Sequence, residues 1–258
     1  MATDVLVCIK RVPDVSGEVL LADDEQSLDA RHVGFTVSPH EECAVELATQ
    51  LAEADGGSVT VLTVGSADAV EQLRGALAVG CTDGVLVEAD TATWGPVDVA
   101  AAIADVVRSR AEAGRSYDLV LLGNDAADTG DFQVPIRLAH ALDRPVVTGI
   151  SKVEIDGGTA VAHGDGPDGT EVYELPLPAV VAVMEGGVSP RYPSIPGRMK
   201  AKRAPVETVT PQDEPRGSGR VRLTLPPRRA STVQVLGRGP EAAPAVVDLL
   251  VEIGVVAR

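Results

Sequence analysis

Runs of successive apolar residues alternate with amphipathic stretches over the first 145 residues of the chain. Apolar residues at every position, rather than at every second one, predict strands buried on both faces of a parallel sheet. The stretches between them have apolar residues at helical spacing. Strands that alternate with helices predict right-handed crossovers and a doubly wound, mainly parallel α/β sheet of the Rossmann-like type. The expected strands are residues 5–9, 59–64, 85–87 and 117–122, and the expected helices are residues 39–55, 68–79, 97–113 and 132–143.

Local signals mark where these helices begin and end. Residues 38–41 read Ser-Pro-His-Glu, which is a capping box with proline at the first helical position. Gly56, Gly80 and Gly114 follow the first three helices, where a left-handed residue commonly ends a helix. The fourth helix ends before Pro145, because proline cannot continue it.

Beyond residue 145 the apolar runs become short, and Gly/Asp turns separate them. Residues 150–155, 160–163 and 172–175 therefore predict an antiparallel extension of the sheet. Residues 177–183 predict another buried strand. A further short hairpin is expected earlier, between residues 18–21 and residues 35–37.

The C-terminal part of the chain has a composition that cannot form a core of its own. Residues 205–227 are rich in Pro, Gly, Arg and acidic residues, which predicts an extended arm. A final helix over residues 242–253 has an apolar face that must pack on another surface. We therefore expect an α/β domain of residues 1–204, followed by an arm that ends in a helix over residues 205–258.

Composition limits the classes of partner. A net charge of −16 argues against nucleic acid or an anionic membrane as a partner. No apolar run approaches the roughly 20 residues of a membrane span, and the first residues do not read as a secretory leader. Cys8, Cys43 and Cys81 are far apart in apolar surroundings, which favours buried free thiols over a metal site. We therefore expect a soluble cytoplasmic protein, and we assign no metal ligands.

The loop after the strand ending at residue 122 is the first candidate for a site. Residues 123–130 are nearly all small or turn-forming, and a helix follows them. A loop of this kind places backbone N–H groups at the carboxyl edge of the sheet, where a helix dipole favours a phosphate. The loop has no lysine in a Walker arrangement and no spaced-glycine fingerprint. By itself it is therefore equally consistent with an ordinary strand-to-helix connection.

Six motifs are spread along nearly the whole chain: VLVCIKRVPD, AVELA, LRGALAVGCTDGVLVE, DLVLLGNDAAD with QVP, LPAVVAV and PRYPSIPGRMKAKR. Together they resemble the β subunit of electron-transfer flavoproteins. The resemblance implies a heterodimer in which the α subunit carries a redox FAD, while the β subunit binds a nucleotide and does no chemistry itself. It implies that this nucleotide is AMP in common members and a second FAD in electron-bifurcating members. It also implies a recognition loop that docks on acyl-CoA dehydrogenases, with the electrons passing to a membrane quinone reductase.

The nucleotide pocket is expected where the strands end at the carboxyl edge of the sheet. Most contacts would come from the backbone, which suits the small residues found there. Asp128 and Asp131 are interpreted as helix caps, and Asp125 as either a pocket residue or a turn former. The candidate residues are Ile9, Lys10, Ser38, Val64, Gly65, Gly123, Asn124, Asp125, Ala126, Asp128, Thr129, Gly130, Asp131, Phe132, Gln133 and Val134.

The recognition loop is expected at residues 186–203, where a turn-rich loop leads into a basic run. The resemblance aligns its aliphatic anchor with Ile195, and the neighbouring Pro196 favours an extended, presented side chain. The basic residues of the loop either steer acidic partners or form a solvated face. The candidate docking residues are Arg191, Tyr192, Ile195, Pro196, Met199 and Lys200.

The sequence departs from the family pattern at a few positions. Asp125 stands where glutamine is usual, Ser38 where asparagine is frequent, and Val15 where an aromatic residue can lie near the flavin. His163 takes the place of a basic residue. Two other functions stay open. One is a subunit of an electron-bifurcating flavoprotein that contacts NADH, and the other is a free-standing adenine-nucleotide-binding module.

Overall fold

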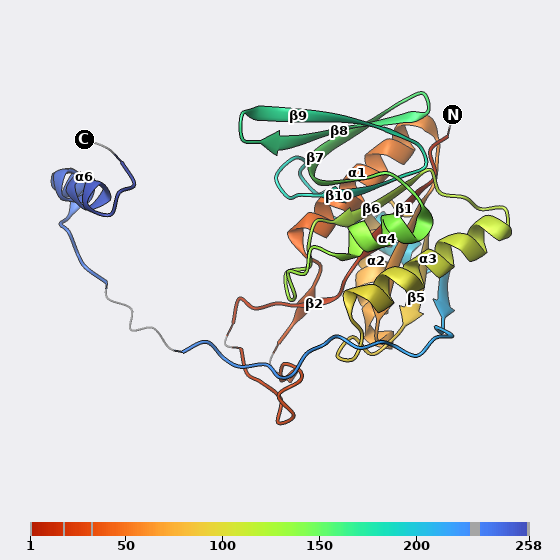
Figure 1. The fold of residues 1–258 in the computed structure, drawn as a ribbon, viewed down its shortest axis with the longest axis horizontal. Helices are drawn as coiled ribbons and strands as arrows, with labels where there is room; N and C mark the ends of the chain where they lie inside the picture. Colours follow the sequence, from red (N-terminus) through yellow and green to blue (C-terminus); the bar gives the residue numbers. More distant parts are fainter. Residues whose placement is uncertain (1, 18, 32, 228–232, 257–258) are drawn as a thin grey trace. The chain divides into compact units, whose positions relative to one another are not determined.

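The computed structural model describes residues 2–17, 19–31, 33–227 and 233–256. The chain forms two units, Met1–Leu223 and Thr224–Arg258. The first unit is built on a nine-stranded sheet in the order β11-β5-β4-β1-β6-β10-β7-β8-β9 (Figure 1). Its parallel part contains β1 (Val5–Ile9), β4 (Val59–Gly65), β5 (Asp83–Glu88), β6 (Leu119–Gly123), β10 (Ala179–Val183) and β11 (Val206–Val209).

The order of the strands explains why the sheet is doubly wound. The chain passes from β1 to β4 and β5 on one side, and then crosses to β6 on the other side of β1. Both neighbours of β1 run parallel to it, with Val5 opposite Val59 in one and Leu119 in the other. The expected mainly parallel sheet is confirmed, and its topological switch point lies between β1 and β6.

Helices cover the two faces of the sheet. Successive residues of β1 point to opposite faces, so that Val5 and Val7 belong to one buried cluster and Leu6 and Cys8 to the other. The first cluster packs under α1 (Pro39–Asp55) and α2 (Val70–Val79), which the short helix η1 (Ala67–Ala69) precedes. The second cluster packs under α3 (Pro96–Glu112) and α4 (Val134–Leu142). Cys8, Cys43 and Cys81 are all buried free cysteines.

The expected antiparallel extension is present at one edge. Strand β7 (Val146–Asp156) begins parallel to β10 and then pairs antiparallel with β8 (Thr159–Gly166), which pairs with β9 (Gly169–Pro176). At the opposite edge, β11 pairs with β5. This strand lies in the segment that composition predicts to be an extended arm. It was not predicted, because four residues that pair at a sheet edge hardly change the composition of the segment.

The early hairpin was assigned the wrong partner. Strand β3 (Phe35–Thr36) pairs with β2 (Val12–Pro13), not with residues 18–21, and Glu18 lies outside the described residues. The excursion between the two strands is closed at its base, where the Asp14 N–H donates to the Gly34 carbonyl at 2.8 Å. In the described part of the excursion, Leu21 also forms a bridge with Leu28, and the Ala22 N–H donates to the Ser27 carbonyl at 2.9 Å.

The expected loop at residues 186–203 contains a helix, α5 (Ile195–Ala201). The Ser194 hydroxyl accepts the Gly197 N–H at 3.1 Å and caps it. Arg74 of α2 donates to the carbonyls of Ala201 and Ala204, so α5 is held on the surface of the first unit. A side chain at Gly197 would place a Cβ 2.3 Å from the Ala78 carbonyl oxygen, which explains the glycine.

The second unit contains η2 (Gly239–Ala242) and α6 (Ala243–Glu252), close to the expected final helix. None of the residues of α6 is buried. In the described part of the chain, no helix is long and apolar enough to cross a membrane.

Candidate functional site

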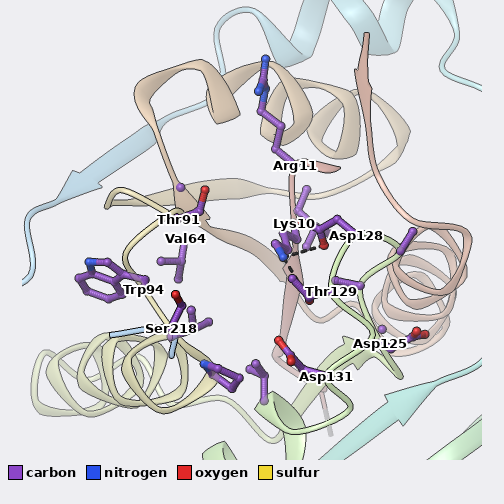
Figure 2. A pocket seen from close by; sticks show the side chains of 18 of the residues that line it. Lys10, Arg11, Val64, Thr91, Trp94, Asp125, Asp128, Thr129, Asp131 and Ser218 are labelled. Carbon is purple, nitrogen blue, oxygen red and sulfur yellow. Dashed lines mark hydrogen bonds and ion pairs between the residues drawn. The ribbon is translucent and has the colours of Figure 1, made fainter. Parts of the chain in front are cut away.

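A cavity of about 850 Å³ opens at the carboxyl edge of the sheet, at the switch point. Residues that follow β1, β4 and β6 form its floor, and the excursion between β2 and β3 contributes Val15, Ser27 and Leu28. Ser218 comes from the chain after β11 and forms part of the wall (Figure 2). Arg220, from the same segment, also lines the cavity. Open α/β sheets bind ligands at this position.

Most of the expected pocket residues line this cavity. Ser38 and Gly130 do not line it. Ser38 supports the loop from behind, since its hydroxyl accepts the Ala127 N–H at 3.1 Å, and Gly130 takes a left-handed φ of 57°. The expected residues that line the cavity are Ile9, Lys10, Val64, Gly65, Gly123, Asn124, Asp125, Ala126, Asp128, Thr129, Asp131, Phe132, Gln133 and Val134.

The loop after β6 is held in place by its neighbours. The Asn124 N–H donates to the Val183 carbonyl at 2.8 Å, and the Asn124 side chain accepts the Gly149 N–H at 2.9 Å. At Gly123 a Cβ would lie 2.6 Å from the Cγ of Glu41, so only glycine allows this close approach. These contacts fix the shape of the loop.

Two backbone N–H groups of the loop already have acceptors within the loop itself. The N–H groups of Thr129 and Gly130 both donate to the Ala126 carbonyl within the loop. Phe132 has a left-handed φ of 54°, and α4 begins only at Val134, two residues later than expected. The N–H groups of residues 131–134 therefore remain as candidates for anion binding at the start of α4.

Lys10 supplies a positive charge beside this loop. Its Nζ lies 2.7 Å from the Asp128 carboxylate and 3.5 Å from the Thr129 hydroxyl (Figure 2). Asp128 is therefore paired with a cation rather than serving only as a helix cap. This pairing reduces the repulsion that an anionic ligand would meet at the carboxylate.

Glu41 brings a buried carboxyl group to the cavity. Burial raises its pKa to about 8, although hydrogen bonds from the backbone N–H groups of Ser38 and Lys10 act in the opposite direction. One of its oxygens accepts the Ser38 N–H at 3.1 Å, which completes one half of the expected capping box. Sequence reasoning identified Glu41 only as a cap and missed its position at the cavity.

Other lining residues were missed because they come from distant segments. Trp94 follows β5, and Arg220 donates to the Gln26 carbonyl at 2.7 Å across the wall. Arg11 places its guanidinium 3.3 Å from the centre of the Phe35 ring, and both residues line the cavity. No local pattern marks these residues, since tertiary contacts alone bring them together.

His40 is another residue without a sequence signal. Its Nε2 lies 3.0 Å from Asp125 Oδ1, and its Nδ1 accepts the Glu185 N–H at 2.8 Å. Asp125 is therefore a pocket residue tied to α1. His163, the other histidine noted as a departure, lies on β8 with Nε2 3.6 Å from Glu154, away from this cavity's lining.

The expected docking residues lie on and before α5. Tyr192 and Ile195 are 95% and 81% exposed, and Met199 is exposed beside them. Pro196 and Lys200 are exposed on the same short helix. Arg191 differs, because its guanidinium pairs with Glu46 at 2.9 Å and Glu53 at 2.7 Å on α1. It is a structural anchor rather than a free steering charge.

The doubly wound sheet and the cavity at its switch point define a Rossmann-like α/β protein, and the loop after β6 lines that cavity. The sequence model of the Electron transfer flavoprotein domain family matches residues 28–214. The chain belongs to this family, on the branch of the β subunits. It is 36% identical to the electron transfer flavoprotein subunit beta of Syntrophomonas wolfei, over 91% of this chain and 90% of that protein. It is 34% identical to the subunit beta of Bacillus subtilis, over 96% of this chain and 97% of that protein.

Proposed function

We propose that this chain is the β subunit of a heterodimeric electron-transfer flavoprotein that acts as an electron carrier rather than as an acid–base catalyst. The observation that carries the proposal is the preformed loop at the switch point in a chain whose relatives are named β subunits. Those names imply an α subunit. The FAD held with that subunit supplies the redox chemistry. This chain helps to position the flavin and provides the surface on which the donor docks.

The nucleotide proposed for the cavity is AMP. Its volume of about 850 Å³ lies within the range of small-molecule sites. Residues 131–134 at the start of α4 would hold the phosphate, with Lys10 nearby as a positive charge. Ile9, Val64 and Gly65, at the ends of β1 and β4, would line the remaining part of the ligand.

The donor is proposed to be an acyl-CoA dehydrogenase or a related enzyme that binds at residues 192–200. The acceptor would be a quinone reductase at the membrane, with this protein in the cytoplasm. The chain from residue 205 to residue 258 is proposed to pack on the α subunit through its terminal helix. A net charge of −16 disfavours nucleic acid as a partner.

A second FAD in place of AMP is the other candidate. The cavity is near the upper end of the usual volumes, and Phe35, Trp94 and Phe132 line it as possible platforms for a planar ring. The family resemblance implies the loop sequence Asp-Gly-Asp-Thr for bifurcating members, whereas residues 128–131 of this chain read Asp-Thr-Gly-Asp. This difference favours AMP.

The test is to purify the chain together with its α subunit, denature the complex and quantify the released FAD and AMP. We expect one FAD and one AMP per heterodimer. Two FAD and no AMP would establish the second candidate. A folded chain that binds AMP but never an α subunit would instead favour a free-standing nucleotide-binding module.

A further inference from the structure

Helix α1 touches both the candidate nucleotide pocket and the segment that leads to the docking residues. At its N-terminus the Ser38 hydroxyl accepts the Ala127 N–H, and His40 Nε2 lies 3.0 Å from Asp125 Oδ1. Asp125 and Ala127 both line the pocket. Figure 2 shows Asp125 at the edge of the pocket, beside α1. One rigid element therefore bears directly on the ligand loop.

The segment after β10 is attached along one side of the same helix. The Glu185 N–H donates to His40 Nδ1 at 2.8 Å, and the Cys43 thiol donates to the Val188 carbonyl at 3.5 Å. Farther along, Glu46 accepts hydrogen bonds from the backbone and guanidinium of Arg191. Positions 40, 43 and 46 are three residues apart, so they lie on one side of the helix. The docking residues begin directly after Arg191.

His40 is the point at which these two sets of contacts meet. Because Nδ1 accepts the Glu185 N–H, it carries no proton, and the other ring nitrogen, Nε2, is the one that lies 3.0 Å from Asp125 Oδ1. The side chains of His40 and Asp125 are only 18% and 17% exposed, so water competes little for these contacts. A shift of Asp125 with the ligand loop therefore changes the orientation of a ring that also holds the backbone of Glu185.

We propose that His40 is a positioning residue that couples occupancy of the nucleotide pocket to the geometry of the docking segment. The inference rests on the proposed function, because it requires a nucleotide at residues 123–134 and a partner at residues 192–200. A nucleotide that orders the loop holds Asp125, and His40 passes this constraint to residues 185–191. By linkage, a partner that orders the docking segment must tighten nucleotide binding by the same factor.

Hydrogen exchange of the α–β complex, measured with and without added AMP, tests this coupling. In the wild-type complex we expect AMP to slow exchange both in residues 123–134 and in residues 184–191. In His40→Ala the slowing should persist in the first segment and be lost in the second. The lost effect should be about fivefold, as expected for one net hydrogen bond. His140→Ala, which removes an exposed imidazole from α4, is the matched control and should behave as the wild type.

A second variant guards against a general folding defect. Asp125→Ala removes the contact between the ligand loop and His40 but leaves the bond between His40 and Glu185. Because Asp125 also lines the pocket, AMP is added to this variant at a saturating concentration set by the affinity measured for the variant itself. The variant should then uncouple the two segments in the same way, while thermal unfolding shows whether each variant is folded. The inference would be overturned if AMP slowed exchange in the wild-type complex only at residues 123–134. It would also be overturned if AMP still slowed exchange at residues 184–191 in both variants. Failure of AMP to bind the wild-type complex would overturn the proposed function itself.

Discussion

At the scale of single residues, Glu41 shows how packing and ionisation oppose each other at the pocket. Its side chain is buried against Gly123, and this burial raises the carboxyl pKa to about 8. A carboxyl whose pKa is higher in the folded state binds a proton that the unfolded chain releases. Its contribution to stability is therefore fully present below its unfolded value of 4.5 and is lost as the pH rises through 8.

The variant Glu41→Gln keeps an acceptor for the Ser38 N–H and removes the ionisation. We expect its stability relative to the wild type to increase from pH 5 to pH 8, by at most about 1.4 kcal/mol for each pH unit. Urea unfolding of both proteins at three pH values measures this slope. Glu71→Gln, at an exposed position of α2, is the control and should show no such trend. A pH-independent difference for Glu41→Gln would mean that Glu41 is ionised in the folded protein.

At the scale of elements, the short helix α5 carries both positions that pack on the first unit and the residues proposed for docking. Ala201 is buried, and Gly197 fits closely against Ala78, so these positions hold the helix in place. Ile195 is 81% exposed and contributes little to that packing. An exposed aliphatic side chain at the start of a well-anchored helix is suited to insert into a partner.

We expect Ile195→Ala to weaken binding of the dehydrogenase by about 5- to 150-fold, or about 1–3 kcal/mol, with unfolding unchanged. Neutralising Lys200 and Lys202 together should instead slow association, and that effect should shrink at high salt. Dehydrogenase-driven reduction of the complex at several ionic strengths distinguishes the two. Val172→Ala, which truncates an exposed aliphatic on β9, is the control. An unchanged rate in Ile195→Ala would place docking elsewhere.

At the scale of the whole molecule, none of the described residues of the second unit, 224–227 and 233–256, is buried. Residues of α6 such as Val246 and Val247 are exposed, and so is Ile253 directly after the helix. The unit spans only 35 residues, Thr224–Arg258, which is short for a domain that folds around a core of its own. Exposed apolar surface on such a short segment is typical of a segment that packs on a partner.

We therefore expect the isolated chain to be colourless and to self-associate, and co-expression with the α subunit to suppress this. Sedimentation of the chain alone and of the complex measures the difference. Replacing Val246 and Val247 with serine should reduce the association of the isolated chain and weaken the complex. A monodisperse isolated chain whose unfolding temperature does not change with the α subunit would contradict this expectation.

The sequence by itself determined the elements and the order in which they assemble. Continuous apolar runs predicted the strands β1, β4, β5 and β6. A strand that is buried on both faces of a sheet is apolar at nearly every position, and this run stands out from the polar residues on either side. The helix from Pro39 to Asp55 was predicted to the residue, since a cap and a terminating glycine are local signals. The loop after β6 was identified for the same reason, because its small residues are contiguous.

Only the tertiary structure decided which groups meet at the pocket. His40 and Glu185 are 145 positions apart, and Arg220 meets Gln26 across 194 positions. Helix α5 also escaped prediction, because seven residues with two basic side chains carry little helical periodicity and the helix depends on α2. Periodicity and capping arise from neighbours along the chain, whereas these contacts arise from the packing of separate elements, which a single sequence does not encode in any local pattern.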